Sequence, residues 1–422
     1  MNTSPPRGTR DFFPEDMRLQ SWLLGHFRES ARIFGFEEYD TPVVESEELY
    51  VRKQGEEIVD QLYTFEDKSG RRLALRPEMT PSLARLVIQR GSAIALPLKW
   101  FSIPQCWRYE RMSRGRRREH YQWNVDIFGV EGPAAEIELI AVLTTFFGRV
   151  GIASEDVIIR VSSRRILEAV LADAGVSEEL YVPVCLLVDK LEKIPREEVE
   201  SQVRELGIDP EIVGRIIDVV SLDSLEAVAS EVDEERAGIA DVRELFALAK
   251  SYGVADWLRF DPSLVRGLAY YTGLVFEAFD RGGDLRAICG GGRYDRLLSN
   301  FGGKDIPACG FGFGDAVIVE LLKDKQLIPD PAPDHVDDVV FAFSEELRSH
   351  AMAVAARLRA GGRAVDLVLE RGKRMKWAFR HADNVGAARL MLLAPDEWER
   401  GAVRVCDLES GQEKEVALDA IT

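Results

Sequence analysis

The sequence lacks the features that mark membrane, metal-binding and disulfide-linked proteins. No run of about 18 uninterrupted apolar residues is present, so we expect no transmembrane helix and no membrane partner. The first ten residues contain no apolar stretch, and we expect no signal peptide. The five cysteines form no CxxC pair and the five histidines are scattered, which predicts no protein-bound metal and fits a reducing cytoplasm.

Two common nucleotide-binding motifs are also missing. The glycine-rich segment Cys289–Asp295 is not followed by Gly-Lys-Ser or Gly-Lys-Thr, so it is not a P-loop. It also lacks the GxGxxG pattern with an acidic residue downstream, which leaves a dinucleotide-binding fold with little support. The glycines here and in Gly310–Gly314 would instead let the backbone approach a ligand closely.

The charge of the chain is acidic overall but basic in one segment. A net charge of −18 argues by itself against nucleic acid as a partner, because phosphate contacts need Lys and Arg, and we expect no DNA binding. The segment Trp107–His120, however, contains six arginines and only two glutamates. Arginine suits bidentate phosphate recognition, so a triphosphate or RNA is the natural ligand. The alternative is an ordinary solvated charged face.

The organisation of the chain suggests two or three domains for its 422 residues. Apolar residues at helical spacing predict a helix between Pro14 and the stop signal Gly35. A strand-rich region follows, an inserted helical module is expected at about 175–250, and 327–336 is a linker. An alternating β/α pattern over 337–422 then predicts a small, mostly parallel-sheet domain.

A β-hairpin is predicted within the strand-rich region. Leu98–Arg111 and His120–Val130 have strand character and are joined by Met112–Glu119. Because alternate residues share a face, Arg108 and Glu110 point the same way on the first strand. By the same rule, one face of the second strand carries Gln122, Asn124 and Asp126. Such a polar face either binds a small polar ligand or is simply solvated.

Two further segments place polar groups on constrained backbone. Glu78 lies between two prolines, and a carboxylate held in this way suits a ligand ammonium. A turn in which Thr80 caps a helix explains the same pattern equally well. In Leu264–Tyr271 an arginine beside a glycine precedes two tyrosines, which would bring a cation and a phenol together or pack the entry to a strand.

Together these segments resemble the histidyl-tRNA synthetases, a class II family, and in particular its plant-organellar-like and bacterial members. The resemblance runs along the whole chain. It rests on an opening signature, class II motifs 1 and 2, and two histidine-specific peptides: Arg7–Asp11, Tyr39–Pro42, Trp107–Arg111, Arg266–Tyr271 and Gly291–Asp295.

The resemblance implies a fold and an activity. The fold is α+β: helices flank an antiparallel class II catalytic sheet within a domain at 1–326, which contains the helical insertion, and an α/β anticodon-binding domain occupies 337–422. The implied enzyme is an aminoacyl-tRNA ligase that activates L-histidine with ATP and Mg²⁺ and transfers it to the 3′ end of tRNA(His). A cytoplasmic homodimer is expected.

The family motifs also imply roles for individual residues. Arg108 would grip the α-phosphate, and Arg266 would bridge it to the histidine carboxylate, which makes these two arginines catalytic. The implied histidine-binding residues are Glu78, Met79, Thr80, Gln122, Asp126, Arg266, Tyr270 and Tyr271. The implied ATP-binding residues are Arg108, Glu110 and Arg116.

For tRNA, the implied contacts are Arg114, Arg117, Arg374 and Lys376. The last two belong to a basic run that also contains Trp377 and Phe379. Cations interleaved with aromatics suit single-stranded RNA, although a solvated helix face has the same composition.

The chain departs from the family pattern at three positions. Ala269 replaces a common aspartate, and Asp126 stands where many bacterial members have glutamate. Val317 occupies the place of the motif 3 arginine that contacts ATP, so either another cation serves ATP or ATP binding is impaired. Organellar plant-like members share this Gly-Phe-Gly-Phe-Gly-Asp-Ala form, and we expect an active enzyme.

Two other functions fit parts of the sequence. A paralogue of these synthetases is the regulatory subunit of ATP phosphoribosyltransferase, and the missing motif 3 arginine favours it. Such paralogues typically lack the C-terminal domain and the arginine of the first histidine-specific peptide, whereas this chain has that domain and Arg266. The third function is an RNA-binding protein with an inactive catalytic core.

Overall fold

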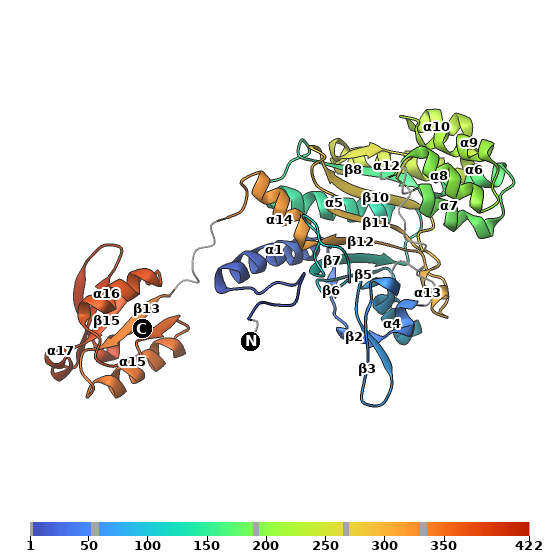
Figure 1. Ribbon diagram of the computed structural model, residues 1–422. Coiled ribbons are helices and arrows are strands. Elements are labelled where there is room, and N and C mark those ends of the chain that lie inside the picture. Colours follow the sequence, from blue (N-terminus) through green and yellow to red (C-terminus); the bar gives the residue numbers. More distant parts are fainter. Residues whose placement is uncertain (1–2, 52–58, 189–193, 265–269, 330–335, 422) are drawn as a thin grey trace. The chain divides into compact units, whose positions relative to one another are not determined.

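The computed structural model describes residues 3–51, 59–188, 194–264, 270–329 and 336–421. The chain forms two compact units, and the main division between them falls between Ile328 and Pro329. Figure 1 colours both units along the sequence. Within the described ranges, no helix is long and apolar enough to span a membrane.

A largely antiparallel sheet of nine described strands is the centre of the first unit (Figure 1). Among these strands, only the edge pairs β1–β5 and β8–β9 run parallel. The strands lie in the order β1 (Glu37–Glu38), β5 (Leu98–Ser102), β7 (Glu119–Phe128), β12 (Ala308–Gly314), β11 (Cys289–Arg293), β10 (Leu274–Asp280), β8 (Val157–Ser163) and β9 (Leu258–Phe260), with β6 (Gln105–Trp107) paired to β7. The predicted α+β class with an antiparallel sheet is confirmed.

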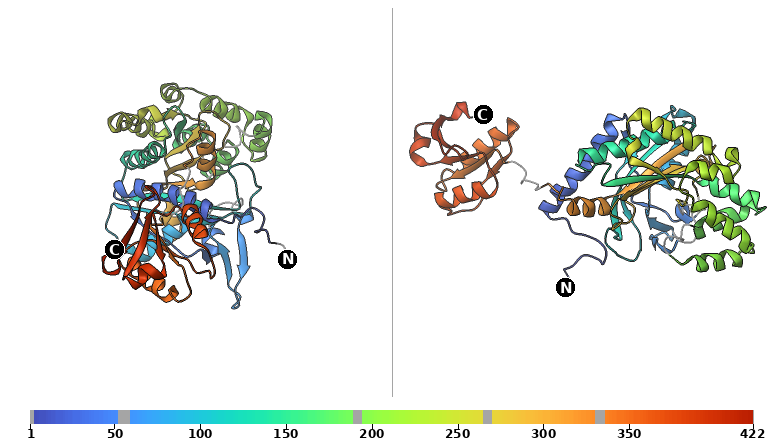
Figure 2. Two further views of the ribbon diagram at one scale, coloured as in Figure 1. Left: turned by 90° about the vertical axis from the view of Figure 1, so that its left-hand side faces the viewer. Right: turned by 90° about the horizontal axis from the view of Figure 1, so that it is seen from above.

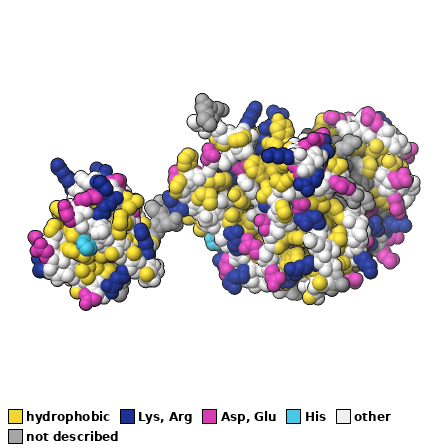
Figure 3. All heavy atoms as spheres, turned by 90° about the horizontal axis from the view of Figure 1, so that it is seen from below, with side chains coloured by type: hydrophobic (Ala, Val, Ile, Leu, Met, Phe, Trp, Pro, Cys, Tyr) yellow, Lys and Arg dark blue, Asp and Glu magenta, His cyan; other side chains and the backbone are white. Residues whose placement is uncertain are grey.

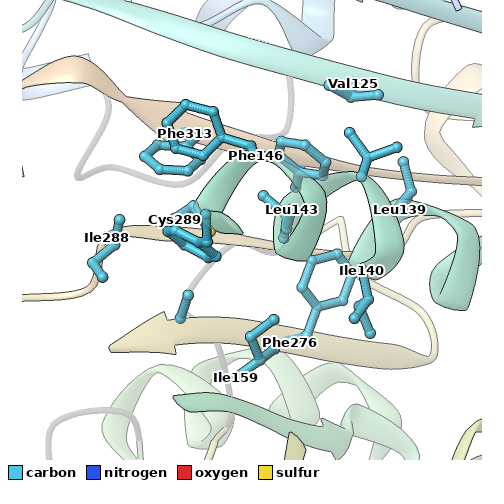
Figure 4. Close-up of a cluster of buried hydrophobic side chains, with 14 of the residues drawn as sticks. Val125, Leu139, Ile140, Leu143, Phe146, Ile159, Phe276, Ile288, Cys289 and Phe313 are labelled. Carbon is cyan, nitrogen blue, oxygen red and sulfur yellow. The ribbon is translucent and has the colours of Figure 1, made fainter. Parts of the chain in front are cut away.

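The main core lies where helices α1 (Pro14–Ile33) and α5 (Ala134–Arg149) pack against this sheet. Trp123 of β7 is fully buried there and stacks on Phe27 of α1, with ring centroids 4.7 Å apart. Figure 4 shows α5 side chains such as Leu143 directed at apolar residues of the strands. This packing leaves the opposite face of β7 for polar side chains.

Local sequence signals define both ends of α1. Pro14 is its first residue, and Glu15 and Asp16 follow in the first turn, where negative charge favours the helix dipole. At the other end Gly35 adopts φ 76°, and the amide of Phe36 donates to the carbonyl of Ala31 at 3.2 Å. The helix predicted between Pro14 and Gly35 is confirmed.

Smaller elements complete the first unit, and one of their strands, β4, leads directly into a buried arginine. Arg76 is 2% exposed, donates to the carbonyl oxygen of Thr41 at 2.6 Å and pairs with Asp40 at 2.8 Å. It thereby holds the segment Tyr39–Pro42 in place. The smaller elements are the antiparallel strands β2 (Val44–Ser46), β4 (Arg72–Leu75) and β3 (Tyr63–Glu66), the helices α2 (Glu48–Val51), α4 (Thr80–Arg90), α12 (Ile239–Tyr252), α13 (Leu297–Asn300) and α14 (Asp315–Asp324), and the 3-10 turns η1 (Gly91–Ala93) and η3 (Ala255–Trp257).

A helical module forms a separate cluster within the first unit, drawn mainly in green in Figure 2. Helices are present between 175 and 250, as predicted, but the apolar cluster already begins with α6. Helix α12 instead packs on the main core through Val242 and Leu245. The module contains α6 (Arg164–Asp173), η2 (Glu178–Leu180), α7 (Tyr181–Val188), α8 (Arg196–Glu205), α9 (Pro210–Val220), α10 (Leu225–Glu231) and α11 (Glu234–Ala237).

The predicted hairpin differs from the structure in its first strand. The prediction of one continuous strand over Leu98–Arg111 is wrong, because it is divided into β5 and β6 and ends at Trp107. Pro104 lies at the break and has no amide hydrogen for the ladder, although its carbonyl accepts from Gln122 at 3.0 Å. Arg108 and Glu110 therefore lie on irregular backbone and do not share a strand face.

The C-terminal unit is a five-stranded sheet with α15 (Arg348–Ala360) on one face and α16 (Met375–Asn384) on the other. Val340 packs with α15 and its neighbour Val339 with α16. The order is β14 (Val365–Leu367), β13 (Asp338–Ala342), β15 (Arg389–Leu393), β16 (Ala402–Asp407) and β17 (Glu413–Ala417), and the unit also contains α17 (Pro395–Glu399) and η4 (Leu418–Ala420).

The prediction of a mostly parallel C-terminal sheet is wrong in its second half. β13 pairs in parallel with β14 and β15, but β15–β16 and β16–β17 are antiparallel. The connection from β15 to β16 holds only the short helix α17, and parallel neighbours need a longer crossover.

The surface matches the acidic but mixed composition. Figure 3 shows acidic and basic side chains interspersed over one face of the larger unit, with apolar side chains between them. Positive charge is therefore informative only where it is concentrated, as it is around the second of the two adjoining cavities described below.

A buried ion pair ties the sheet to α5. Arg293 at the end of β11 donates to both carboxylate oxygens of Glu136, at 2.6 and 2.7 Å, and to the carbonyl oxygens of Val130 and Gly132. Glu136 is fully buried, and this burial raises its pKa while Arg293 opposes the rise. Part of the second histidine-specific peptide thus has a structural role.

Replacing Glu136 by glutamine removes the buried counter-charge of Arg293 and leaves only the more exposed Asp295, 3.2 Å away, as its ionic partner. We expect the free energy of unfolding of the first unit to fall by roughly 3–5 kcal/mol. Glu29→Gln is the control, because the pair of Glu29 with Arg32 lies on the surface and its loss changes stability little. Denaturant unfolding followed by tryptophan fluorescence measures both variants, and equal losses would contradict the role of the pair.

Candidate active site

A cavity of about 230 Å³ opens on the polar face of β7. The side chains of Gln122, Asn124 and Asp126 line it together, while Trp123 and Val125 point into the core. The face predicted from residue alternation is therefore correct. The cavity also brings together most of the predicted ligand contacts: Glu78, Thr80, Arg108, Glu110, Arg116, Gln122, Asp126, Tyr270 and Tyr271.

Asp126 forms the floor of this cavity and is 4% exposed. The hydroxyl of Tyr294 donates to its Oδ1 atom. Burial raises the pKa of Asp126 to about 7, although the hydrogen bond from Tyr294 opposes this rise. The carboxyl is thus poised between its neutral and charged forms near neutral pH, and it responds to a ligand that donates a hydrogen bond or carries charge.

Two glycines of β12 leave room for these side chains. Gly310 lies opposite Asp126 in the ladder, and a Cβ atom there would overlap both Oδ1 of Asp126 and the hydroxyl oxygen of Tyr294. A Cβ atom at Gly312 would lie 2.6 Å from Nε2 of Gln122. The glycine-rich segment therefore serves the cavity by giving space to the facing strand.

A second carboxylate lies at another wall of the cavity. Glu78 is 4% exposed and lies just before α4, and the hydroxyl of Tyr270 donates to its Oε2 atom at 3.5 Å. Tyr271 lies against Tyr270, with ring centroids 4.9 Å apart. Carboxylates at two positions and phenols between them favour a ligand with more than one nitrogen donor.

The turn before α4 positions Arg108. The Nε atom of Arg108 donates to the carbonyl oxygen of Pro77 at 2.8 Å. Met79 in the same turn is fully buried, accepts from the Thr41 hydroxyl at 3.4 Å, and lines neither cavity described here. Thr80 is the first residue of α4 rather than its N-cap, so its side chain is left to line the cavity.

A second cavity of about 170 Å³ adjoins the first. Arg108, Glu110 and Arg116 line both cavities, and Val317 adds an apolar wall to the second. Burial and nearby positive charges, including that of Arg108, lower the pKa of His120 in this cavity to about 3, so His120 is neutral. The basic residues that line the second cavity are Arg108, Arg116, Arg117 and Arg286.

The remaining predicted residues lie apart from these cavities or outside the description. Arg266 and Ala269 fall outside the described residues. Arg114 pairs with Glu320 and Asp324 of α14 and lines neither cavity. Arg374 and Lys376 are exposed at the start of α16 in the C-terminal unit.

The aromatics of the predicted RNA-binding run are partly occupied. Trp377 and Phe379 are half-buried against the apolar cluster beneath α16. Trp377 also stacks on His381, with ring centroids 4.7 Å apart, and the ammonium group of Lys373 lies over the indole ring of Trp377, 4.7 Å from its centroid. The exposed surface offered to RNA is therefore mainly basic.

A larger cavity of about 550 Å³ lies elsewhere on the first unit. Its surface is mostly apolar, and Glu45, one of its two carboxylates, is already paired with Arg85. It does not bring together the groups that a reaction needs, and we place the chemistry in the two adjoining cavities.

The comparison with known proteins agrees with this geometry. Residues 8–315 match the family model described as histidyl-tRNA synthetase, and residues 337–422 match the model of an anticodon binding domain. The chain belongs to the histidyl-tRNA synthetase family. The known function of this family is to charge tRNA(His) with histidine by means of ATP, which makes the chain an aminoacyl-tRNA ligase.

Individual relatives span nearly the whole chain. The chloroplastic/mitochondrial histidine–tRNA ligase of Arabidopsis thaliana is 55% identical over 418 residues, or 99% of this chain and 86% of that protein. The histidine–tRNA ligase of Opitutus terrae is 40% identical and covers 98% of this chain and 96% of its own length. The crystal structure of histidyl-tRNA synthetase from Nostoc sp. PCC 7120 has a TM-score of 0.75 at 26% identity, covering 99% and 98% of the two chains.

The description of one structural neighbour names both the synthetase and the regulatory subunit, the two functions compared in the sequence analysis. A Bacillus halodurans protein described as an ATP phosphoribosyltransferase regulatory subunit/histidyl-tRNA synthetase has a TM-score of 0.73 at 24% identity. At this identity the likeness shows the shared fold alone.

Tyr294 and Arg286 are among the cavity residues to which the sequence analysis assigned no role. Tyr294 holds Asp126, and its signal was present because it belongs to the peptide Gly291–Asp295. Arg286 lines the second cavity from the loop before β11, and an isolated arginine in a loop gives no sequence signal of its own.

Gly310→Ala tests the space requirement at the cavity floor. The added Cβ atom would displace Asp126 or Tyr294, so we expect histidine binding to weaken by about tenfold or more while the fold persists. Gly25→Ala on the exposed surface of α1 meets no neighbouring atom and is the matched control. Calorimetric titration with histidine measures both variants, and unchanged affinity of Gly310→Ala would refute the constraint.

Asp126→Asn tests the raised pKa. The pKa of Asp126 rises from 3.8 to about 7 on folding, so the unfolded chain loses this proton at lower pH than the folded chain. This carboxyl therefore costs the wild-type protein stability as the pH rises from about 4 to about 7, and asparagine removes that cost. We expect the unfolding free energy of Asp126→Asn, relative to that of the wild type, to be higher at about pH 8 than at about pH 5. The same difference at both pH values would contradict the raised pKa.

Proposed function

We propose that this chain activates L-histidine with ATP and transfers the histidyl group to the 3′ end of tRNA(His). One observation carries the proposal: a carboxylate-lined cavity and an arginine-lined cavity share Arg108, Glu110 and Arg116. A ligand with nitrogen donors in the first cavity would thus meet a polyphosphate in the second. The reaction of this family joins two such ligands.

Histidine is proposed to occupy the first cavity. Asp126 accepts a hydrogen bond from the imidazole, and the buried position of its carboxyl selects a ring that can donate one. Glu78 and Thr80 receive the α-ammonium group with help from Gln122. Met79, also implied by the resemblance, contributes through the backbone of the turn, since its side chain is buried away from the cavity.

ATP is proposed to lie across both cavities. Arg108 contacts the α-phosphate, while Glu110 and Arg116 orient the distal phosphates. A carboxylate oxygen of histidine attacks the α-phosphorus, a new P–O bond forms, and the bond to the β-phosphate breaks so that pyrophosphate leaves. Fixed arginines stabilise the charge that develops on the phosphate oxygens, and no protein nucleophile is needed.

The second catalytic arginine, Arg266, lies outside the described residues, and its role rests on the family resemblance alone. We propose that it bridges the histidine carboxylate and the α-phosphate. In the second step the 3′-hydroxyl oxygen of tRNA attacks the carbonyl carbon of the adenylate, and AMP leaves as the hydroxyl proton is lost.

Mg²⁺ is the metal ion that we propose for the phosphates. Mg²⁺ is usually held by phosphate oxygens together with one or two carboxylates. Glu110 and Glu277 line the second cavity, and no group of three or more candidate metal ligands occurs in the part of the chain that the structure describes. The donor set thus fits an ion brought by ATP, and the ion would neutralise phosphate charge.

The C-terminal unit is proposed to bind the anticodon, and the chain is proposed to act as a cytoplasmic homodimer. Arg374 and Lys376 are exposed on α16, where phosphates can reach them. Arg117 lines the second cavity and Arg114 pairs with carboxylates of α14, and both are proposed to contact tRNA. Four buried free cysteines fit a reducing compartment such as the cytoplasm.

The test is histidine-dependent exchange of labelled pyrophosphate into ATP, with the other amino acids as controls. The proposal predicts exchange with histidine alone, and Arg108→Ala should raise the ATP concentration needed for half-maximal rate about tenfold or more. If no amino acid supports exchange while histidine still binds, the result would contradict the synthetase assignment and favour the regulatory subunit.

A further inference from the structure

The second cavity contains a cation that the protein itself does not neutralise. Arg286 forms no ion pair and no side-chain hydrogen bond within the described part of the chain. Two nearby cations are already paired, Arg116 with Glu110 and Arg114 with two carboxylates of α14. Arg117 lines the same cavity and, like Arg286, forms no ion pair among the described residues. A guanidinium without a partner that faces a cavity is available to an anion.

The surroundings of Arg286 make the binding of an anion beside it more favourable. Its pKa is lowered, first by partial desolvation and next by the positive charge of Arg116, with a further contribution from Arg108. Glu110 and Glu277 act in the opposite direction but do not offset these effects. An anion bound among these arginines would relieve their mutual repulsion.

The loop that carries Arg286 is held in place by hydrogen bonds from its backbone amides, two of them to the carboxylate of Asp280. Asp280 at the end of β10 accepts from the amides of Asp284 and Leu285, both at 3.1 Å. Beyond Arg286, the amide of Ile288 donates to Ala278 at 2.8 Å. The arginine is therefore presented to the cavity from an ordered loop, so little backbone entropy is lost when it binds a ligand.

The position of Arg286 indicates which part of the ligand it meets. Arg108 and Arg116 line both cavities, whereas Arg286 lines only the second. In the arrangement proposed above, the histidine cavity adjoins the α-phosphate. A basic residue that lines only the second cavity, as Arg286 and Arg117 do, therefore faces the β- and γ-phosphates. Val317, which lines the same cavity, offers those phosphates no charge.

We propose that Arg286 binds the β- and γ-phosphates of ATP and the departing pyrophosphate, and thereby supplies the positive charge that Val317 does not. This inference rests on the proposed function, because it uses the placement of histidine in the first cavity. Arg286 thus acts on the leaving group of the activation step.

Arg286→Ala measures this role. We expect the Michaelis constant for ATP in histidine-dependent exchange to rise by about 10- to 100-fold, as for loss of a charge-assisted hydrogen bond, with the constant for histidine nearly unchanged. Arg286→Lys should recover part of the loss, because a point charge remains without the guanidinium fork. An unchanged constant for ATP in the alanine variant would overturn the proposal.

Arg281→Ala is the matched control in the same loop. Arg281 is exposed, lines neither cavity, and donates to the carbonyl oxygen of Ser154 at 2.7 Å. Its replacement should leave the constant for ATP within about twofold of the wild type. An equal rise in both variants would mean that the loop is merely perturbed, and would also overturn the proposal.

A binding measurement separates this inference from the proposed function. Inorganic tripolyphosphate alone, titrated into the full-length wild type and Arg286→Ala, should bind the wild type about tenfold or more tightly. If the wild type fails to catalyse exchange but this difference persists, the function is wrong and the anion site stands. If exchange occurs and the two proteins bind tripolyphosphate equally, the function stands and the role of Arg286 is wrong.

Discussion

The buried hydrogen bond from Tyr294 to Asp126 constrains much of the structure around it. The two side chains meet only because Gly310, opposite Asp126 in the ladder, has no Cβ atom. The other face of the same strand must then be apolar, and Trp123 fills the core beneath α1. One carboxyl placed on the floor of the cavity therefore accounts for the glycines of β12, the tyrosine after β11 and the alternation of β7.

The two adjoining cavities differ in the charged groups that line only one of them. Asp126 and Glu78 line only the first cavity and favour a nitrogen-rich ligand, whereas Arg117 and Arg286 line only the second and favour phosphates. Arg108 stands at the boundary, fixed by the carbonyl oxygen of Pro77. The reacting carboxylate and phosphorus would meet at this boundary. The carboxylates of one cavity and the arginines of the other would therefore direct each substrate to its own cavity and orient it for reaction.

The sequence predicted the parts of the site that depend on local periodicity or on family motifs. Alternation alone placed Gln122, Asn124 and Asp126 on one face, and the structure brings the motif residues Glu78 and Arg108 to the same cavity. The sequence did not predict contacts between distant positions. Tyr294 lies 168 residues from Asp126, and Arg114 lies 206 residues from Glu320 of α14. The antiparallel end of the C-terminal sheet also depends on pairings that single-strand patterns do not encode, whereas the break before β6 has a local signal in Pro104.

The most direct test of the whole account is the charging of a tRNA(His) transcript by the purified full-length chain, measured separately with each amino acid and ATP. The account predicts that histidine alone is attached to the 3′ end and that charging requires ATP. Charging with another amino acid, or histidine binding without any charging, would contradict it.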